Sequence, residues 1–507
     1  MNDRSPKPDA GAIWPANLNV ANRFARNLPA DFYAEVDPVP LPAPHLVAVS
    51  RGAAELLDLD PAEFDRHDLV EIFSGNRMLG GTQALAAVYS GHQFGVWAGQ
   101  LGDGRAHLLA ELETSHGHWE VQIKGGGPTP YSRFADGRAV LRSSIREFLC
   151  SEAMAALGAP TTRALCITGS PQPVARETVE TAAVVTRIAP SFVRFGSFEH
   201  WAAQKRIDEL RTLADFVIAT QYPQLRDDAQ PYAALLKEVA LRTGRMIAHW
   251  QSVGFMHGVM NTDNMSILGL TLDYGPFGFM EAFDAEHICN HSDADGRYAY
   301  RAQPHVAHWN LYRLGNALYP LINDADVTRK AIEDGFGPGY NETFFALMRS
   351  KLGLAQPHES DDHLIGSLFQ LMQANHPDFT LTFRALGKLP AQVDEANRAA
   401  ADAPLRDQFI DRAACDGWIA QWRTRLALEP VRPDAERQAA MNAANPKFVL
   451  RNWIAEGAIR AAREGDFAEI TRVLRCLRSP FDEQPDNAHY AALPPDWASG
   501  LEVSCSS

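Results

Sequence analysis

The sequence predicts an α+β protein in which a strand-rich part is followed by a helix-rich part. Between Gly80 and Gly196 glycine is frequent, and short apolar runs have the length of strands. After Phe198 apolar residues recur at helical spacing over long stretches. Strands and helices do not alternate regularly, which argues against a doubly wound fold and favours a two-lobe α+β architecture.

The strand-rich part contains a predicted hairpin. Its arms are Ala106–Glu113 and Trp119–Lys124, joined around the turn-forming residues 114–118. Side chains alternate between the two faces of a strand, so the second arm has an apolar face and a polar face. The polar face carries Glu120, Gln122 and Lys124.

One helix interrupts the strands. Residues Leu141–Leu157 carry an apolar stripe at helical spacing, and Gly158 is suited to end the helix. Two more strands are predicted after it, at Ala164–Thr168 and Ala182–Ile188. The second part of the chain contains long helical patterns at Asp208–Gln221, Tyr232–Gln251, His305–Ile322, Thr343–Leu352 and Asp361–Ala374.

Composition and charge exclude several classes of protein. The chain has 507 residues, of which 46% are hydrophobic and 21% charged, as in soluble globular proteins. Its net charge of −15 argues against a general binder of nucleic acid or of anionic membranes. The sequence has no uninterrupted apolar run of the roughly 18 residues that a membrane span needs. The polar, proline-broken N-terminus is not typical of a secretory signal.

The cysteines indicate a reducing compartment. None of the six forms a C-x-x-C pair, and Cys150 and Cys166 stand in apolar stretches where small core residues are expected. Free thiols of this kind are usual in the cytosol, so we expect a cytoplasmic protein.

The first candidate for function is the segment Gly99-Gln-Leu-Gly-Asp-Gly-Arg105, directly before the hairpin. Glycine lets the backbone approach a ligand closely, and successive N–H groups can hold phosphate. The order G-x-x-G-x-G differs from the G-x-G-x-x-G of dinucleotide sites. Most glycine-rich loops are only turns, so the segment indicates phosphate binding only together with further motifs.

Lys124 and Glu147 provide such a motif. Lys124 ends the segment Val121-Gln-Ile-Lys124, which is similar to the strand whose lysine contacts ATP phosphates in protein kinases. Glu147 lies on the predicted helix, away from its apolar stripe. A strand lysine paired with a helix glutamate orients the lysine in kinases. Either residue alone would be an ordinary surface charge, but the pair favours a nucleotide site.

A second kinase-like motif follows the predicted helix Tyr232–Gln251. It reads His257-Gly-Val-Met-Asn-Thr-Asp-Asn264, with Asp273-Tyr-Gly275 after a run that predicts two short strands over residues 265–272. Kinases use H-R-D-x-x-x-x-N followed by D-F-G. Asn264 and Asp273 keep the metal-binding positions, but Val259 stands at the position of the catalytic base and cannot accept a proton.

Asp263, next to Asn264, is a carboxylate that could replace the missing base. Together with Asn264 and Asp273 it supplies carboxylate and amide oxygens, which suit Mg²⁺ or Mn²⁺. The alternative is an Asn- and Asp-rich turn without chemistry. The kinase-like order of the motifs, after a lysine and a glutamate, favours the site.

Basic residues could add to a phosphate site in this acidic chain. Arg187 and Arg194 follow the strand-rich region, and a guanidinium group binds phosphate through two parallel hydrogen bonds. Each arginine alone is more often a surface ion pair. Asp136 and Gly137 form a turn by composition and indicate no chemistry by themselves.

Taken together, the motifs resemble those of the selenoprotein O family, and the resemblance runs from about residue 15 to the C-terminus. The segments that carry it are Gly81–Gly95, Gly99–Arg105, Gly127–Arg138, His257–Asn264 and Asp273–Gly278. The resemblance implies a protein-kinase-like two-lobe fold. It also implies transfer of AMP from ATP to Ser, Thr or Tyr hydroxyls of target proteins, with release of pyrophosphate. An inverted nucleotide, also implied, accounts for the missing base at Val259.

The resemblance implies roles for the matched residues. Asp263 is the expected proton acceptor, and Asn264 and Asp273 are the expected ligands of Mg²⁺ or Mn²⁺. Lys124, with Glu147 as its partner, is expected to clamp the distal phosphates together with two arginines. The full set of expected nucleotide-binding residues is Gly102, Gly104, Arg105, Lys124, Asp136, Gly137, Glu147, Arg187, Arg194 and Asp273.

The same resemblance divides the chain into four parts. Residues 1–80 form an N-terminal extension, 81–198 a nucleotide-binding lobe, 199–390 a catalytic lobe, and 391–507 a helical C-terminal extension. The expected partners are ATP and protein substrates, without nucleic acid or membrane. The sequence does not indicate an oligomeric state.

Other functions stay open at this point. The chain could be an atypical kinase that transfers the γ-phosphate with Asp263 as a displaced base, or it could transfer UMP from UTP with Mn²⁺. A non-enzymatic pseudokinase that binds nucleotide and a partner is a third possibility. The presence of Asp263, Asn264 and Asp273 argues against it, because a pure binding protein needs none of them.

Two cysteines suggest regulation. Eukaryotic members of the family carry selenocysteine near the C-terminus, where this chain has Cys505. Cys289 lies in the stretch after Asp273 that corresponds to a kinase activation loop. We hypothesise a regulatory disulfide between Cys289 and Cys505, because a cross-link would favour one arrangement of the chain.

Overall fold

A computed structural model of the chain describes residues 19–503, which divide into two compact units. Unit 1 holds the described residues up to 88 together with 101–144 and 163–192. Unit 2 holds residues 89–100, 145–162 and those from 193 onward. The described part combines a large antiparallel sheet with many helices, so the predicted α+β class is confirmed.

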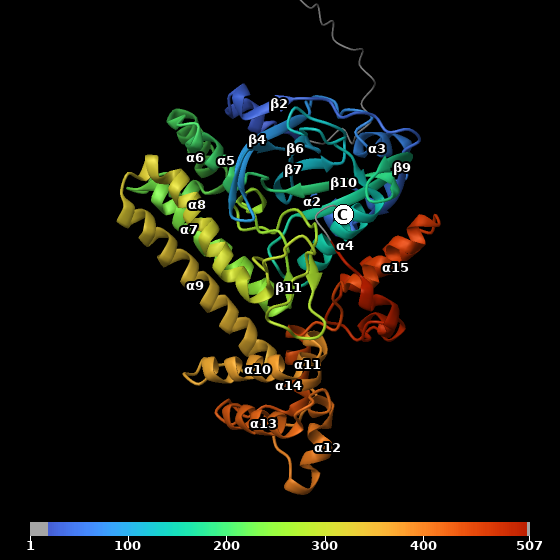
Figure 1. Ribbon diagram of the computed structural model, residues 1–507, viewed down its shortest axis with the longest axis vertical. Helices are drawn as coiled ribbons and strands as arrows, with labels where there is room; N and C mark the ends of the chain where they lie inside the picture. The colour runs from blue at the N-terminus through green and yellow to red at the C-terminus, as the bar shows by residue number, and fades with distance from the viewer. Residues whose placement is uncertain (1–18, 504–507) are drawn as a thin grey trace, which may run out of the picture. The chain divides into compact units, whose positions relative to one another are not determined.

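Ten strands of the described region form one sheet (Figure 1). They are β1 (Asn19–Val20), β2 (Tyr33–Glu35), β3 (His45–Val49), β4 (Leu85–Gln93), β5 (Val96–Gly102), β6 (Ala106–Thr114), β7 (Gly117–Lys124), β8 (Ala139–Val140), β9 (Arg163–Ala175) and β10 (Val179–Ala189). The main order is β2-β4-β6-β7-β10-β9-β3. A separate small sheet pairs β11 (Phe255–Met256) with β12 (Gly278–Phe279).

The predicted hairpin is strands β6 and β7. They are antiparallel, with Leu112 opposite Trp119 and Glu111 opposite Glu120. The turn is tighter than predicted, because pairing continues to Thr114 and Gly117. Strand β10 then pairs with β7 on the other side, with Arg187 opposite Gln122.

The core of unit 1 forms where helices pack on this sheet. Leu112 and Val121 of the hairpin are buried together with Leu165 and Ile188 of β9 and β10. Helices α2 (Arg51–Leu56) and α3 (His67–Phe73) add further apolar side chains to the same cluster, Ala53, Ala54, Leu69, Ile72 and Phe73. The apolar face of the hairpin therefore supports unit 1, as the alternating pattern predicts.

The other helices follow in chain order. They are α1 (Arg23–Asn27), α4 (Leu141–Ala156), α5 (Phe195–Ala203), α6 (Ile207–Gln221), α7 (Pro231–Ser252), α8 (Gln303–Ile322), α9 (Ala325–Lys351), α10 (Asp361–Asn375), α11 (Phe379–Leu386), α12 (Glu395–Arg406), α13 (Arg412–Leu426), α14 (Asp434–Ala444), α15 (Asn452–Arg463) and α16 (Ala468–Leu477). Four of the five helices predicted after Phe198 agree within a few residues: α6, α7, α8 and α10.

Unit 2 is organised by the long helices α7, α8 and α9, which lie side by side (Figure 1). A second apolar cluster joins the small β11–β12 sheet to the helices that follow, with Met256, Phe379, Phe383, Trp418 and Trp422 all buried. Asp378 and Arg451 form a buried ion pair within this region, with oxygen–nitrogen distances of 2.7 and 3.0 Å. Because both charges are desolvated, loss of either partner would leave the other uncompensated.

Helix α9 corrects the prediction of a short helix at Thr343–Leu352, because it begins at Ala325. Glycines and Pro338 in its first half obscure the helical pattern. Gly335 and Gly339 face α7 so closely that a Cβ atom on either would lie 2.4 Å from a backbone oxygen of that helix. The glycines are there because two helix backbones pass each other, and local propensity does not report such a contact.

Residues 265–272 also differ from the prediction of two short strands. They form isolated bridges: Met265 pairs with Thr271, and Ser266 pairs with Arg194. The apolar residues Met265, Ile267 and Leu272 are buried, so their pattern reflects burial and not a regular ladder. Within residues 19–503 no helix combines the length and the apolar run needed to cross a membrane.

The α7–α9 crossing leads to a stability prediction. Gly339→Ala places a methyl group against the Leu241 carbonyl oxygen, and we expect it to lower the free energy of unfolding by about 1–3 kcal/mol. Gly366→Ala on α10 is the control, because a Cβ atom there meets nothing within 4 Å; it should stabilise by about 0.5–1 kcal/mol. Urea denaturation followed by circular dichroism measures both, and equal effects would contradict the role of the crossing.

Candidate functional site

The segment from His257 to Asn264 is held in place by buried hydrogen bonds. Nε2 of His257 donates to the carbonyl of Leu272 at 2.8 Å, which ties the segment to the residue before Asp273. Asn290 donates to Gly258 O and Asn310 donates to Met260 O, each at 2.9 Å. A segment fixed by side chains from distant positions can hold a reactive group without reorganising.

Asp263 lies in the short 3₁₀ turn Thr262–Asn264 and is only 7% exposed. Its Oδ2 atom accepts a hydrogen bond of 3.1 Å from Nε2 of Gln93. Its Oδ1 atom is buried and has no hydrogen-bond partner among the described residues. A buried acceptor without a partner is uncommon in folded proteins and indicates a group reserved for a ligand or proton.

The surroundings of Asp263 also change its acidity. Burial raises the pKa of the Asp263 carboxyl group to about 6, although the Gln93 hydrogen bond and the positive charge of Arg194 act in the opposite direction. A general base works best when its pKa lies near the working pH. The geometry and acidity of Asp263 are therefore those of a proton acceptor.

The end of strand β4 completes the environment of Asp263. A Cβ atom on Gly91 would lie 2.9 Å from Oδ1 of Asp263, so only glycine leaves room for the carboxylate. The backbone N–H of His92 donates to Oγ1 of Thr262 at 2.7 Å, and that of Phe94 donates to Oδ1 of Asn261 at 3.0 Å. These contacts align residues 91–94 with residues 261–263.

Asp273 is the second carboxylate of this group. Its φ angle is +54°, a left-handed conformation that residues other than glycine rarely adopt and that is often found at functional sites. Its Oδ2 atom accepts a hydrogen bond from Arg194, and the same guanidinium nitrogen donates to the backbone carbonyl of Asp263 at 2.7 Å. Arg194 therefore links Asp263 to Asp273.

The residues of this group are chemically suited to a hard cation. The amide nitrogen of Asn264 donates to Val259 O at 3.0 Å, so its side-chain oxygen is left to meet a ligand. Asp273 offers a carboxylate, and both donors are the type that Mg²⁺ or Mn²⁺ prefers. The Asn264 and Asp273 side chains thus fit the predicted metal, and the structure places them in the same unit as Asp263.

A second group of predicted residues assembles within unit 1. The glycine-rich loop packs against residues 129–132: Thr129 donates to Asp103 O at 2.7 Å, and Ser132 donates to Gly104 O. Gly102 has a φ angle of +147°, and a Cβ atom there would lie 2.4 Å from the ring of Tyr131. Two predicted nucleotide-contacting loops are therefore brought together by direct contacts.

Polar side chains on the sheet continue this group. Gln122 of β7 accepts a hydrogen bond from Arg187 of β10 and donates to Asp103 of the glycine-rich loop at 3.4 Å. Lys124 lies two residues beyond Gln122 on the same face of β7, and both are buried. The face thus brings Arg187 and Lys124 near the glycine-rich loop, while Arg105 within that loop is exposed.

Asp136 and Gly137 lie in the same unit but have visible structural partners. Asp136 forms two hydrogen bonds with Arg176, at 2.8 and 2.9 Å, and this interaction holds the pKa of its carboxyl group below the ordinary value. Gly137 has a φ angle of +68° and passes so close to Gly127 that a Cβ atom would overlap its backbone. Their predicted contact with nucleotide stays a prediction.

Lys124 and Glu147 belong to different units, and both are buried. Their pairing therefore stays a prediction.

Cys289 is buried within unit 2, with its thiol 2.9 Å from Pro276 O. The N–H of nearby His291 donates to Val503 O at 2.9 Å, but Cys505 lies outside the described residues, so the disulfide hypothesis stays open.

Sequence reasoning did not assign roles to Gly91 and Gln93. Both lie in a segment that carries the family resemblance, but they are about 170 residues from Asp263 along the chain. No local periodicity or motif connects a glutamine on a strand with an aspartate in a later turn. Only the folded chain shows that Gln93 is a hydrogen-bond donor to Asp263.

Comparison with known proteins shows which family this chain is similar to. Residues 16–478 match the family described as "Protein adenylyltransferase SelO". A relative from Dechloromonas aromatica named "Protein nucleotidyltransferase YdiU" is 62% identical over 486 residues, which cover 96% of this chain and 97% of that protein. A relative of the same name from Herminiimonas arsenicoxydans is 59% identical over 495 residues, covering 97% of each chain.

These matches confirm the resemblance that the sequence motifs indicate. The family match covers most of the chain, and the relatives are similar over nearly their full length. They support nucleotidyl transfer as the general activity of the family. The chain therefore belongs to the SelO family.

Proposed function

We propose that the protein transfers AMP from ATP to Ser, Thr or Tyr hydroxyls of target proteins and releases pyrophosphate. The observation that carries the proposal is the state of Asp263, a buried carboxylate with an unpartnered Oδ1 atom and a pKa of about 6. Asn264 and Asp273 belong to the same unit, while Val259 occupies the position of an ordinary kinase base. The family description supports AMP as the transferred group.

In the proposed reaction, Asp263 acts on the target hydroxyl. Its Oδ1 atom accepts the hydroxyl proton while the hydroxyl oxygen bonds to the α-phosphorus of ATP. The bond between that phosphorus and the oxygen bridging to the β-phosphate breaks, and pyrophosphate leaves with the bonding electrons. The products are an AMP phosphodiester on the protein and pyrophosphate, so atoms and charge balance.

Asn264 and Asp273 would hold Mg²⁺ or Mn²⁺, which when bound neutralises negative charge on the phosphates. Arg194 positions the Asp273 carboxylate and the backbone of Asp263 through its hydrogen bonds. For nucleotide contacts we propose the unit 1 residues Gly102, Gly104, Arg105, Lys124, Asp136, Gly137 and Arg187, with Glu147 and Arg194 from unit 2.

Isotope labelling tests the group that is transferred. Purified protein and Mg²⁺ would be incubated with a mixture of proteins and ATP labelled on either the α- or the γ-phosphate. We expect protein labelling from the α-label only, and its loss in Asp273→Ala. Labelling from the γ-label only would overturn the proposal in favour of a kinase. A parallel reaction would contain α-labelled UTP and Mn²⁺. If protein were labelled in that reaction and not with ATP, the transferred group would be UMP and not AMP.

The pKa of Asp263 leads to a pH prediction. A base must be deprotonated, so kcat/KM for AMP transfer should be near its maximum above about pH 7, be half-maximal near pH 6 and fall about tenfold per pH unit at lower pH. Asp263→Asn keeps the shape of the side chain but cannot accept the proton; it should lose roughly 100- to 10,000-fold in rate. A wild-type profile that is flat from pH 5 to 8 would exclude Asp263 as the base.

The hydrogen bond from Gln93 leads to a separate prediction. Gln93→Leu removes a donor that lowers the pKa of Asp263, so the acidic limb of the pH profile should move to higher pH. Val96→Ala changes an exposed side chain at the start of the next strand, β5, and should leave the limb in place. Matching profiles for the two variants would show that Gln93 does not act through Asp263.

A further inference from the structure

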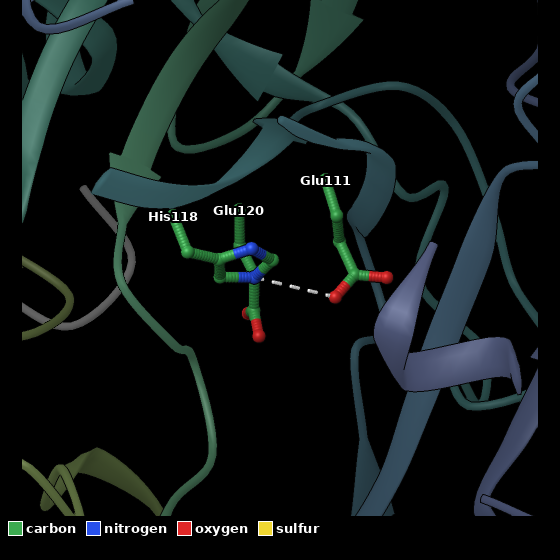
Figure 2. A group of neighbouring side chains, drawn as sticks. All are labelled: Glu111, His118 and Glu120. Atoms are coloured by element: carbon green, nitrogen blue, oxygen red, sulfur yellow. Dashed lines mark ion pairs between the residues drawn. The ribbon is translucent and has the colours of Figure 1, made fainter. Parts of the chain in front are cut away.

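Strands β6 and β7 bring four ionisable side chains to one face of the hairpin. Glu111 stands opposite Glu120, and Glu113 stands opposite His118. Glu111 is 2% exposed and Glu120 is 4% exposed. Figure 2 shows the side chains of Glu111, His118 and Glu120 converging on a common region.

Two carboxylates directly opposite each other in a buried position repel one another. Like charges at such cross-strand positions destabilise a sheet, and burial removes the water that would screen them. The pair therefore needs a positive charge or a bound proton.

His118 lies beside the buried pair and is close enough to share a ligand with it. Its Nδ1 atom lies 3.0 Å from Oε1 of Glu113, and because a carboxylate only accepts, Nδ1 is the nitrogen that carries hydrogen. Its Nε2 atom faces Glu111, whose Oε1 atom is 3.5 Å away (Figure 2). A carboxylate that fixes one imidazole nitrogen while the other faces a metal is the usual arrangement of histidine ligands.

We propose that Glu111, His118 and Glu120 bind a divalent transition-metal ion, Zn²⁺ or Mn²⁺. One ligand atom from each residue lies within 4.8 Å of the other two, so small side-chain movements bring all three to bonding distance. Imidazole suits Zn²⁺, whereas carboxylate ligands suit Mn²⁺ as they do Mg²⁺ and Ca²⁺, so the histidine of this set favours Zn²⁺ and the two carboxylates also admit Mn²⁺. The three residues are separate from Asp263, Asn264 and Asp273, which belong to unit 2.

The surrounding hydrogen bonds indicate a structural role for this site. Glu111 accepts two hydrogen bonds from the backbone N–H of Phe24, at 2.9 and 3.1 Å. Glu120 accepts one from the N–H of Phe192 at 2.7 Å. A metal held by both carboxylates would tie helix α1 and the segment after β10 to the hairpin. Metal loss should therefore lower the stability of unit 1. None of the three proposed ligands is among the residues proposed for nucleotide binding.

Metal binding can be measured on the full chain. Asp273→Ala protein, which lacks a ligand of the proposed magnesium site, would be stripped with EDTA and titrated with ZnCl₂ or MnCl₂ by calorimetry. We expect about one saturable ion per chain and a metal-dependent rise in the thermal unfolding midpoint. Adding His118→Ala or Glu120→Gln should abolish both, whereas His116→Ala in the exposed hairpin turn should keep both.

Two outcomes would overturn the proposal. One is the absence of saturable Zn²⁺ and Mn²⁺ binding in the Asp273→Ala protein, or binding that survives both ligand substitutions. The other outcome concerns the thermal unfolding midpoint and has two parts. The midpoint of the Asp273→Ala parent does not rise when metal is added, and without metal the midpoint of the Glu120→Gln protein equals or exceeds that of the EDTA-treated parent. That result would mean that a shared proton holds the carboxylates together. Glu120→Gln is nearly isosteric, so it tests the site even if His118→Ala fails to fold.

Discussion

The close approach of the β4 backbone to the Asp263 carboxylate is the constraint on which the candidate site depends. The Asp263 carboxylate leaves no room for a side chain at position 91, which is a glycine. The backbone N–H groups of His92 and Phe94 donate hydrogen bonds to Thr262 and Asn261. Gln93 takes up one carboxylate oxygen, while the other stays buried without a partner. Burial raises the pKa of Asp263 to about 6, and the close approach of Gly91 is part of that burial.

In unit 1, burial affects the two faces of the sheet differently. Apolar side chains on one face form the core of the unit, and polar side chains gather on the other face. Gln122 connects Arg187 with Asp103, which draws the glycine-rich loop toward the cations of the sheet. The same face carries Glu120, whose carboxylate is buried beside Glu111. Desolvated charges of this kind are stable only when each has a partner, so the face constrains what can bind there.

Strong local patterns predicted much of the fold and site. The β6–β7 alternation and the stripes of helices α6, α7, α8 and α10 report burial directly, and their positions agree with the structure. The first part of helix α9, before Thr343, was not predicted because its glycines serve a contact with α7. Residues 265–272 have the apolar pattern of strands because they are buried. In both regions, tertiary packing outweighs the local preference.

Residue types and their spacing along the chain were enough to establish the α+β class, the family and the order of its motifs. The environment of each candidate residue, in contrast, depends on how the chain folds. In the folded chain Gln93 donates a hydrogen bond to Asp263, Arg194 to Asp273, and Arg176 to Asp136. Hydrogen bonding and desolvation act through space, so residues far apart in sequence determine which carboxylate can accept a proton.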